Sequence, residues 1–364
     1  MKTCKLCHNP AEIVSEAIGY CAGCIQSHFS AILPAIRKVH AESRKLYGLP
    51  VKPPRAPEGT LCGLCFHHCR IPEDQTGFCG QRRNKGGRIQ GGRPHEGNLS
   101  FYHDPLPTNC VADFVCPGGT GSGYPAYSDF RGPEIGRKNL AVFYQACSFN
   151  CLYCQNHHFR ELTFSRHNVT SRELAAAVDP ETRCICYFGG DPAPQILHAV
   201  KASKIAKQKT KGRALRICWE TNGAVQAKFL KMMAELSLSS GGCIKFDLKA
   251  WDERIHLSLC GVSNRQTLEN FKTAAGWVCL RPKPPLLIAS TLMVPGYIDA
   301  DEVAAIAGFI AGLNPEIPYS LLAFYPRFYL NDLPVTSRAQ AMRCKAAAEK
   351  KGLLNVHIGN AHLL

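Results

Sequence analysis

The sequence predicts an α/β protein whose main domain is a barrel-like, mostly parallel sheet. From residue 140 onward, six short apolar runs alternate with amphipathic segments. That alternation is typical of buried parallel strands and the helices that cover them. Six units are fewer than the eight of a full TIM barrel, so we expect a partial (βα)6 barrel over residues 139–364. The first 138 residues instead contain clusters of cysteines, and we expect this part of the chain to form small metal-binding modules.

Bulk composition limits the class of protein further. The 364 residues are 45% hydrophobic and 20% charged, which fits a soluble globular chain. Because no apolar run reaches 18 residues and no apolar leader begins the chain, we expect a cytoplasmic protein without a membrane span. In that compartment the 20 cysteines favour metal ligation over disulfides. The net charge of +15 is scattered, which favours a basic surface or an acidic protein partner over nucleic acid.

Residues 1–48 are predicted to form a zinc-ribbon-like module followed by a helix. Two Cys-x2-Cys pairs supply four thiolates, which close a tetrahedral site for zinc or for a rubredoxin-like iron. These ligands are Cys4, Cys7, Cys21 and Cys24. The helix is expected over residues 25–47, with Pro34 kinking or splitting it. Residues 49–60 are rich in proline and predict a linker.

Residues 61–138 carry a second cysteine cluster in an otherwise irregular region that we expect to act as a lid or platform. Its four candidate ligands are Cys62, Cys65, Cys69 and Cys79. Zinc or an auxiliary iron–sulfur cluster fits this set, and unmetallated buried thiols are the alternative. Further along, Cys110 and Cys116 flank an apolar segment, and we expect them in the core or in a loop that lines the active site.

Three cysteines directly follow the first apolar run of the main domain. Cys147, Cys151 and Cys154 have the spacing Cys-x3-Cys-x2-Cys. Thiolates are the usual ligands of iron–sulfur clusters, and three of them on a four-iron cube leave one iron open to a small molecule. A structural zinc site is the alternative, but it needs four ligands and no fourth is nearby. The spacing therefore predicts a [4Fe-4S] cluster.

Polar segments also follow the later apolar runs. They are Gly189-Gly190-Asp191-Pro192, Glu220-Thr221-Asn222-Gly223, Asp247-Leu248-Lys249, Val294-Pro295-Gly296 and Tyr325-Pro326-Arg327. Active sites of parallel barrels gather at the carboxyl ends of the strands, so we expect these segments to meet the cysteines at one rim. Glycine, proline and asparagine are common in turns after strands, which would explain each segment taken alone. It would not explain why three cysteines are expected at the same rim.

These motifs resemble the radical S-adenosylmethionine (SAM) superfamily. In that family an aromatic residue precedes the last of the three cysteines, and Tyr153 matches it. The later segments resemble, in the same order, those of the pyruvate formate-lyase activating enzymes. The Cys62–Cys79 stretch is similar to that of radical SAM proteins found beside AMMECR1 and Memo proteins, and the module at residues 1–48 is an addition.

The resemblance implies which residues contact SAM. They are Tyr153, Gly189, Gly190, Asp191, Thr221, Asn222 and Lys249, with Asp191 in place of a more common glutamate. Two positions depart from the activating enzymes, because Ser290 stands where they have an arginine and Tyr325 where they have a histidine. We expect Arg327 to supply the missing cation.

The resemblance also implies the reaction. A reduced cluster, supplied by ferredoxin or flavodoxin, splits SAM, and the 5′-deoxyadenosyl radical abstracts hydrogen from a protein or peptide. One alternative is a cobalamin-dependent radical SAM methyltransferase that modifies a protein such as methyl-coenzyme M reductase. The altered SAM pocket favours it, whereas the absence of an Asp-x-His-x2-Gly cobalamin motif does not. The remaining alternative is a non-enzymatic zinc and iron–sulfur module that binds nucleic acid.

Overall fold

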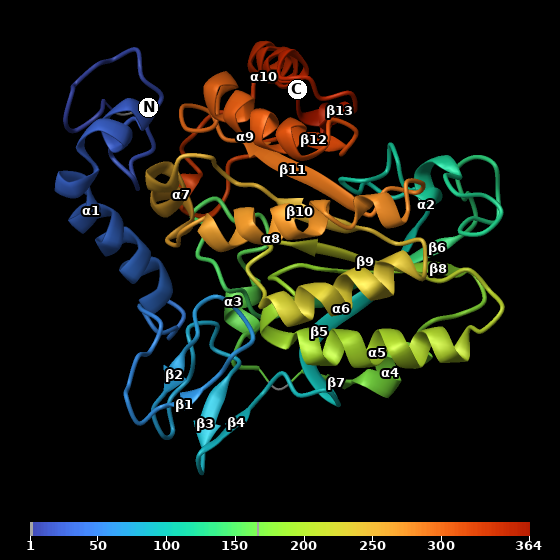
Figure 1. The fold of residues 1–364 in the computed structure, drawn as a ribbon. Helices are drawn as coiled ribbons and strands as arrows, with labels where there is room; N and C mark the ends of the chain where they lie inside the picture. The colour runs from blue at the N-terminus through green and yellow to red at the C-terminus, as the bar shows by residue number, and fades with distance from the viewer. Residues whose placement is uncertain (1–2, 166) are drawn as a thin grey trace.

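The computed structural model describes residues 3–165 and 167–364, and within them a nine-stranded sheet forms the centre of the molecule (Figure 1). Seven of its strands run parallel. In spatial order these are β13 (Val356–Gly359), β12 (Tyr319–Ala323), β11 (Leu287–Met293), β10 (Ile244–Asp247), β9 (Arg216–Thr221), β8 (Thr182–Phe188) and β6 (Lys138–Tyr144). The α/β fold and all six predicted strands are confirmed, and β13 adds a seventh parallel strand.

Helices connect the parallel strands and pack on the sheet. They are α4 (Ser171–Ala176), α5 (Ile196–Lys209), α6 (Ala227–Leu238), α7 (Glu253–Cys260), α8 (Arg265–Ala275), α9 (Ala300–Leu313) and α10 (Arg338–Lys350). Trp219 of β9 is fully buried in this packing, and its Nε1 donates to Ser237 Oγ of α6 at 3.1 Å. No helix in the described part of the chain is long and apolar enough to cross a membrane.

Local sequence signals set two of the helix ends. Thr170 and Glu173 form a reciprocal capping box at the start of α4, with Thr170 Oγ1 accepting from the Glu173 N–H at 3.1 Å. At the far end of the chain, Gly352 follows α10 with φ +95°, a left-handed conformation that glycine adopts without strain.

Two antiparallel strands extend the sheet beyond β6. β5 (Glu96–Pro105) pairs with β6 from Leu99 opposite Tyr144 to Pro105 opposite Lys138, and β7 (Asn168–Thr170) pairs with β5. β5 has no clear sequence signal because most of its second half is solvent-exposed and carries mixed polar and aromatic residues, so no alternation marks it. β13 has no clear signal either, because that strand is four residues long and only half-buried.

The N-terminal helix α1 (Ala22–Lys45) lies beside α7 at the edge of the barrel. Its backbone departs from helical geometry at His28, where φ is −128° and ψ is 31°. Pro34 lies inside the continuous part of the helix, so the expected break is displaced by six residues toward the N-terminus. The helix is tied to the core by His40, whose Nε2 lies 3.1 Å from the Ser258 carbonyl oxygen.

The second cysteine-rich region folds into small hairpins that dock on the barrel. The strands are β1 (Thr60–Leu61) with β2 (Arg70–Ile71), and β3 (Arg83–Lys85) with β4 (Arg88–Gln90). This region contacts the barrel just beyond β9, where the Phe66 N–H donates to the Ala224 carbonyl oxygen at 2.9 Å. Short helical turns complete the chain: α2 (Pro117–Thr120), α3 (Phe159–Leu162), and 3-10 turns at Ala193–Gln195, Val278–Leu280, Phe328–Leu330 and Ala361–Leu363.

Candidate active site

The three cysteines that follow β6 line a cavity of about 230 Å³ at the carboxyl ends of the parallel strands. Residues from the ends of five further strand–loop segments line the same cavity. Among them are Gly189, Gly190, Asp191, Thr221, Asn222, Asp247, Lys249, Ser290 and Leu322. The structure thus brings the cysteines together with most residues that the sequence analysis placed at one rim, Tyr153 included.

Both N-terminal regions hold the cysteine loop in place. His67, which lies between two cysteines of the second module, has its Nε2 2.7 Å from the Ser148 carbonyl oxygen. From the other side, Asn150 donates its amide to Ser43 Oγ of α1 at 2.8 Å. Asn222 donates to Ser148 Oγ at 3.0 Å and to Cys147 Sγ at 3.7 Å, so the loop is fixed from three directions.

The loop after β8 passes directly over the end of β6, and only glycine fits there. Gly190 has φ +59°, and a Cβ at this position would lie 2.2 Å from the Tyr144 carbonyl oxygen and 2.5 Å from that of Ala146. The next N–H, that of Asp191, donates to the Ala146 carbonyl at 2.8 Å. Because Gly190 has no side chain, the backbone of the loop after β8 can contact the backbone at the end of β6, beside the cysteines.

Asp191 joins the loops after β8 and β9. Its Oδ2 accepts from Thr221 Oγ1 at 3.0 Å and from the Asn222 N–H at 2.8 Å, and its Oδ1 accepts from the Ala193 N–H at 2.8 Å. Burial raises the pKa of this carboxyl group to about 6, although these donors favour the charged form. The resemblance predicts Asp191 as a SAM contact, and the structure shows that both of its oxygens also organise the chain itself.

Lys249 is the only positively charged residue among those that line the cavity in the described part of the chain. Its Nζ lies 2.8 Å from Asp247 Oδ2, and Ser290 donates its hydroxyl to Asp247 Oδ1 at 2.8 Å. Burial alone would lower the pKa of Lys249, but the Asp247 carboxylate and the nearby thiols raise it well above its usual value. The cavity therefore keeps a charged ammonium group at neutral pH.

Tyr325 and Arg327, which we expected beside SAM, lie next to this cavity: Gln155, a lining residue, donates its side-chain amide to the Tyr325 carbonyl oxygen at 2.8 Å. Neither belongs to the lining of this cavity within the described residues. Tyr325 is 44% exposed, and the Arg327 guanidinium carbon sits 5.3 Å from the centre of its ring. Among the described residues the cation in the cavity lining is Lys249, and a role for Arg327 at SAM stays a prediction.

The donor set suits an iron–sulfur cluster better than a single metal ion. Four sulfurs around one zinc lie about 3.8 Å apart, given Zn–S bonds of about 2.3 Å. Among the described residues, only the cysteines of the first module place three or more candidate ligand atoms all within 4.8 Å of one another. Cys147, Cys151 and Cys154 share a cavity at wider spacing, and Cys147 Sγ also accepts the Phe149 N–H at 3.3 Å. Thiols that are too far apart to share one ion, and that accept backbone N–H donors, are suited to bind separate irons of one cluster.

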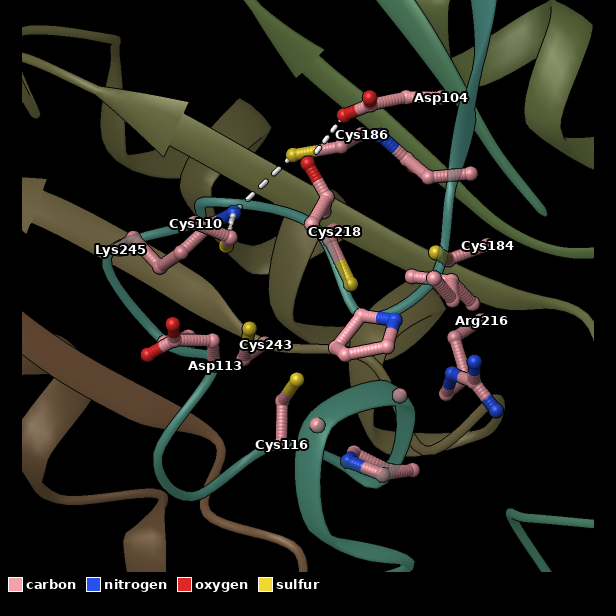
Figure 2. A pocket seen from close by; sticks show the side chains of 18 of the residues that line it. Asp104, Cys110, Asp113, Cys116, Cys184, Cys186, Arg216, Cys218, Cys243 and Lys245 are labelled. Carbon is pink, nitrogen blue, oxygen red and sulfur yellow. Dashed lines mark hydrogen bonds between the residues drawn. The ribbon is translucent and has the colours of Figure 1, made fainter. Parts of the chain in front are cut away.

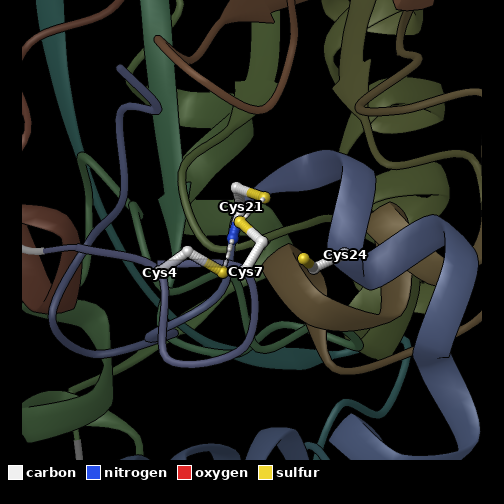
Figure 3. Close-up of side chains that lie close together, drawn as sticks. All are labelled: Cys4, Cys7, Cys21 and Cys24. Atoms are coloured by element: carbon white, nitrogen blue, oxygen red, sulfur yellow. Dashed lines mark hydrogen bonds between the residues drawn. The ribbon is translucent and has the colours of Figure 1, made fainter. Parts of the chain in front are cut away.

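The first module is compact enough for one ion. The four sulfurs of Cys4, Cys7, Cys21 and Cys24 all lie within 4.8 Å of one another (Figure 3). The Cys21 N–H donates to Cys4 Sγ at 3.4 Å, as backbone donors commonly do to metal-bound thiolates. By contrast, Cys62, Cys65, Cys69 and Cys79 surround a very small cavity together with His67 and His68.

A larger cavity of about 540 Å³ lies on the opposite side of Glu220 and Phe188, which line both spaces. Six cysteines and the buried Lys245 line it (Figure 2). No contiguous motif predicts that these residues share one site. The available signal was the spacing Cys184-x-Cys186, because alternate residues of a strand face the same side.

Comparisons with known proteins agree with this geometry. Residues 141–306 match the family model of the radical SAM superfamily. The chain is 24% identical over 310 residues to the uncharacterized protein MJ0808 of Methanocaldococcus jannaschii, across 82% of this chain and 80% of that protein. It is 28% identical over 176 residues to pyruvate formate-lyase 1-activating enzyme of Escherichia coli, across 48% of this chain and 67% of that enzyme.

A radical SAM methyltransferase from Sphaerobacter thermophilus is among the similar solved structures, with 16% identity, a TM-score of 0.47 and coverage of 61% of this chain and 66% of that one. The conclusion rests instead on the family match over residues 141–306 and on the activating-enzyme relatives. The chain carries a radical SAM domain and is a radical SAM enzyme.

Proposed function

We propose that this enzyme cleaves SAM reductively and uses the 5′-deoxyadenosyl radical to abstract hydrogen from a protein or peptide. The observation that carries the proposal is the single cavity shared by Cys147, Cys151, Cys154 and Lys249 at the strand ends. A [4Fe-4S] cluster bound by the three thiolates would supply the one electron that the cleavage needs. That electron comes from a protein donor such as ferredoxin or flavodoxin.

The residues around the cavity have separate tasks in this scheme. The Lys249 ammonium group offers a charged partner for the SAM carboxylate. The glycine backbone at 189–190 admits the methionine part of SAM where a side chain would obstruct it. Apolar side chains, among them Phe149, Leu292 and Leu322, line the remaining wall and exclude water from the reactive carbon.

Balance of the reaction is simple. One electron enters the sulfonium, the S–C5′ bond breaks, and methionine leaves. The radical takes one hydrogen atom from a substrate C–H bond, which gives 5′-deoxyadenosine and a substrate radical. A protein substrate is supported by the activating-enzyme relatives and by the net charge of +15, which complements an acidic protein surface.

The structure weakens the reason for considering a cobalamin-dependent methyltransferase. That alternative depended on space vacated by the missing arginine at position 290. Ser290 is 1% exposed and bonded to Asp247, which in turn pairs with Lys249, so the position is part of a connected polar group. We therefore favour hydrogen abstraction. For the compact first module we propose one structural zinc ion, which four thiolates at this spacing hold tetrahedrally.

The substrate class is tested with a deuterated cell extract that is separated by filtration into protein and small-molecule fractions. Each fraction is incubated anaerobically with the reconstituted enzyme, SAM and a reductant. We expect deuterium in 5′-deoxyadenosine with the protein fraction only. Deuterium from the small-molecule fraction alone, or S-adenosylhomocysteine forming with every turnover, would contradict the proposal.

A further inference from the structure

The cavity of about 540 Å³ inside the barrel has a lining that the SAM reaction does not use. Its thiols come from the loop after β5 and from three neighbouring strand segments. They are Cys110, Cys116, Cys184, Cys186, Cys218 and Cys243 (Figure 2). Six thiols around one space are far more than packing needs, and thiolates are the ligands of iron–sulfur clusters.

A shared lysine contact, strand pairing and core packing place four of these cysteines near one another. Lys245 Nζ lies 3.1 Å from Cys110 Sγ and 3.0 Å from Cys186 Sγ, so these two sulfurs are at most about 6 Å apart. Cys186 and Cys218 are register partners on adjacent parallel strands. Cys243, directly before β10, packs in one cluster with Cys110, Cys116 and Cys218.

The cavity thiols as a group are not arranged as a compact tetrahedral site for one ion. Among the described residues, only the first module places three or more ligand atoms all within 4.8 Å, and the cavity thiols are not part of that group. A cluster of several metals spans the wider gap, because each thiolate binds a different iron. The cavity also has the room, since it is more than twice the size of the cavity beside Cys147.

Lys245 supplies the matching charge. Its side chain is 2% exposed, and its three donors point at Glu220 Oε1, at 2.6 Å, and at the two sulfurs. A buried ammonium group is costly unless anions surround it, and neutral thiols satisfy it poorly. A cluster with four thiolate ligands carries net negative charge, and N–H donors to its sulfurs raise its reduction potential.

We propose that the barrel cavity binds a second iron–sulfur cluster through Cys110, Cys186, Cys218 and Cys243, with Lys245 as its charged neighbour. Because Glu220 and Phe188 line both cavities, this cluster would lie next to the SAM site, within reach of electrons exchanged with the substrate. Cys184 lies toward Arg216 and Cys116 lies beside Cys243 (Figure 2), and we assign neither as a ligand.

The test compares the full-length protein with two matched variants after anaerobic reconstitution. One variant replaces the four proposed ligands with alanine, and the other replaces Cys116 and Cys184. We expect the first to lose about four irons and as many sulfides per chain, as a [4Fe-4S] cluster contains. The second keeps them. Retention of iron in the first, or its loss from the second alone, would overturn the assignment.

Paramagnetic resonance separates a lost site from a lost fold. The cluster beside Cys147 has an open iron, so SAM should change its signal, whereas the cavity cluster should give a signal that SAM leaves unchanged. We expect the four-cysteine variant to lose only the second signal. If that variant does not fold, two single variants test the same proposal. They are Cys110→Ala, which changes a loop residue, and Lys245→Met. Cys110→Ala should abolish the SAM-insensitive signal, and Lys245→Met should lower the reduction potential of the cluster that gives it. If neither variant alters that signal, the proposed cluster is refuted.

Discussion

The ammonium nitrogen of Lys249 lies 2.8 Å from Asp247 Oδ2, and both side chains line the cavity of the three cysteines. The pair explains how a cation persists in a buried site: burial opposes the charge, and the carboxylate restores it. It also places that cation at a strand end where a bound SAM carboxylate can meet it.

Lys249→Met should weaken SAM binding at least tenfold, which is about 1.4 kcal/mol. The substitution removes the only cation of the cavity lining in the described part of the chain and leaves Asp247 unpaired. Arg327→Ala is the control, because Arg327 stacks on Tyr325 outside the cavity. Calorimetric titration of SAM under nitrogen measures both. Weaker binding in the Arg327 variant with normal binding in the Lys249 variant would reverse the assignment.

Gly190→Ala should prevent assembly of the SAM site. The added Cβ would meet the Tyr144 and Ala146 carbonyl oxygens at 2.2 Å and 2.5 Å, which displaces the backbone beside Cys147. Gly86→Ala is a matched control, since Gly86 has φ +61° against +59° for Gly190 but nothing within 4 Å of the new Cβ. Iron content and SAM affinity should fall in the first variant only. Equal losses in both would mean that backbone strain, not the clash, decides the effect.

Loss of the first metal site should loosen only the start of the chain. Cys7→Ser combined with Cys21→Ser should remove about one equivalent of zinc and speed hydrogen exchange over residues 3–21. The barrel should stay protected, because α1 is held independently by His40 and Ser43. Cys279→Ser, at an exposed cysteine, is the control. Unchanged zinc content in the double variant, or lost protection in the strands, would disagree with this prediction.

The buried pair of Arg216 and Glu134 should contribute to stability in a pH-dependent way. Both side chains are at most 2% exposed, and Arg216 Nη1 lies 3.0 Å from Glu134 Oε1. Arg216→Met strands a buried carboxylate, so we expect a loss of about 3–5 kcal/mol at pH 7. Arg265→Met, which breaks an exposed pair with Glu253, should cost at most about 1 kcal/mol. Urea unfolding measures both variants.

The sign of the pH effect follows from Glu134. Burial would raise the pKa of this carboxyl group, but Arg216 lowers it below its ordinary value of 4.5. The stabilisation is therefore complete above pH 4.5 and is lost as pH falls through the lowered pKa. In Arg216→Met the unpaired Glu134 should protonate readily, so the gap between the two proteins narrows in acid. A gap that widens below pH 4.5 would contradict the assigned pair.

The sequence predicted those parts of the fold that have strong local signals. Six buried strands appear as short, mostly apolar runs, and the Thr170–Glu173 pattern of a capping box marks the start of α4. β5 escaped because its strand character comes from pairing with β6, a long-range interaction that leaves little local pattern. The break in α1 was placed at Pro34, but packing allows the proline and bends the chain at His28 instead.

The same distinction applies to the site. Contiguous motifs located the cysteines and the loops at Gly190, Asn222 and Lys249, because turns after parallel strands share one rim. Arg327 follows the last predicted strand as the motif requires, but whether its side chain reaches the cavity depends on tertiary packing, which no local pattern encodes. The six-cysteine cavity was missed because its members are scattered from residue 110 to residue 243 and meet only when the strands pair.

The most direct test of the central claim is the product of SAM turnover in the wild-type protein and in the variant with Cys147, Cys151 and Cys154 replaced by alanine. Both proteins are reconstituted anaerobically, reduced and given SAM, and 5′-deoxyadenosine and methionine are quantified by mass spectrometry. We predict equal amounts of the two products from the wild type and none from the variant. Continued 5′-deoxyadenosine formation by the variant, or none from a cluster-loaded wild type, would contradict the account.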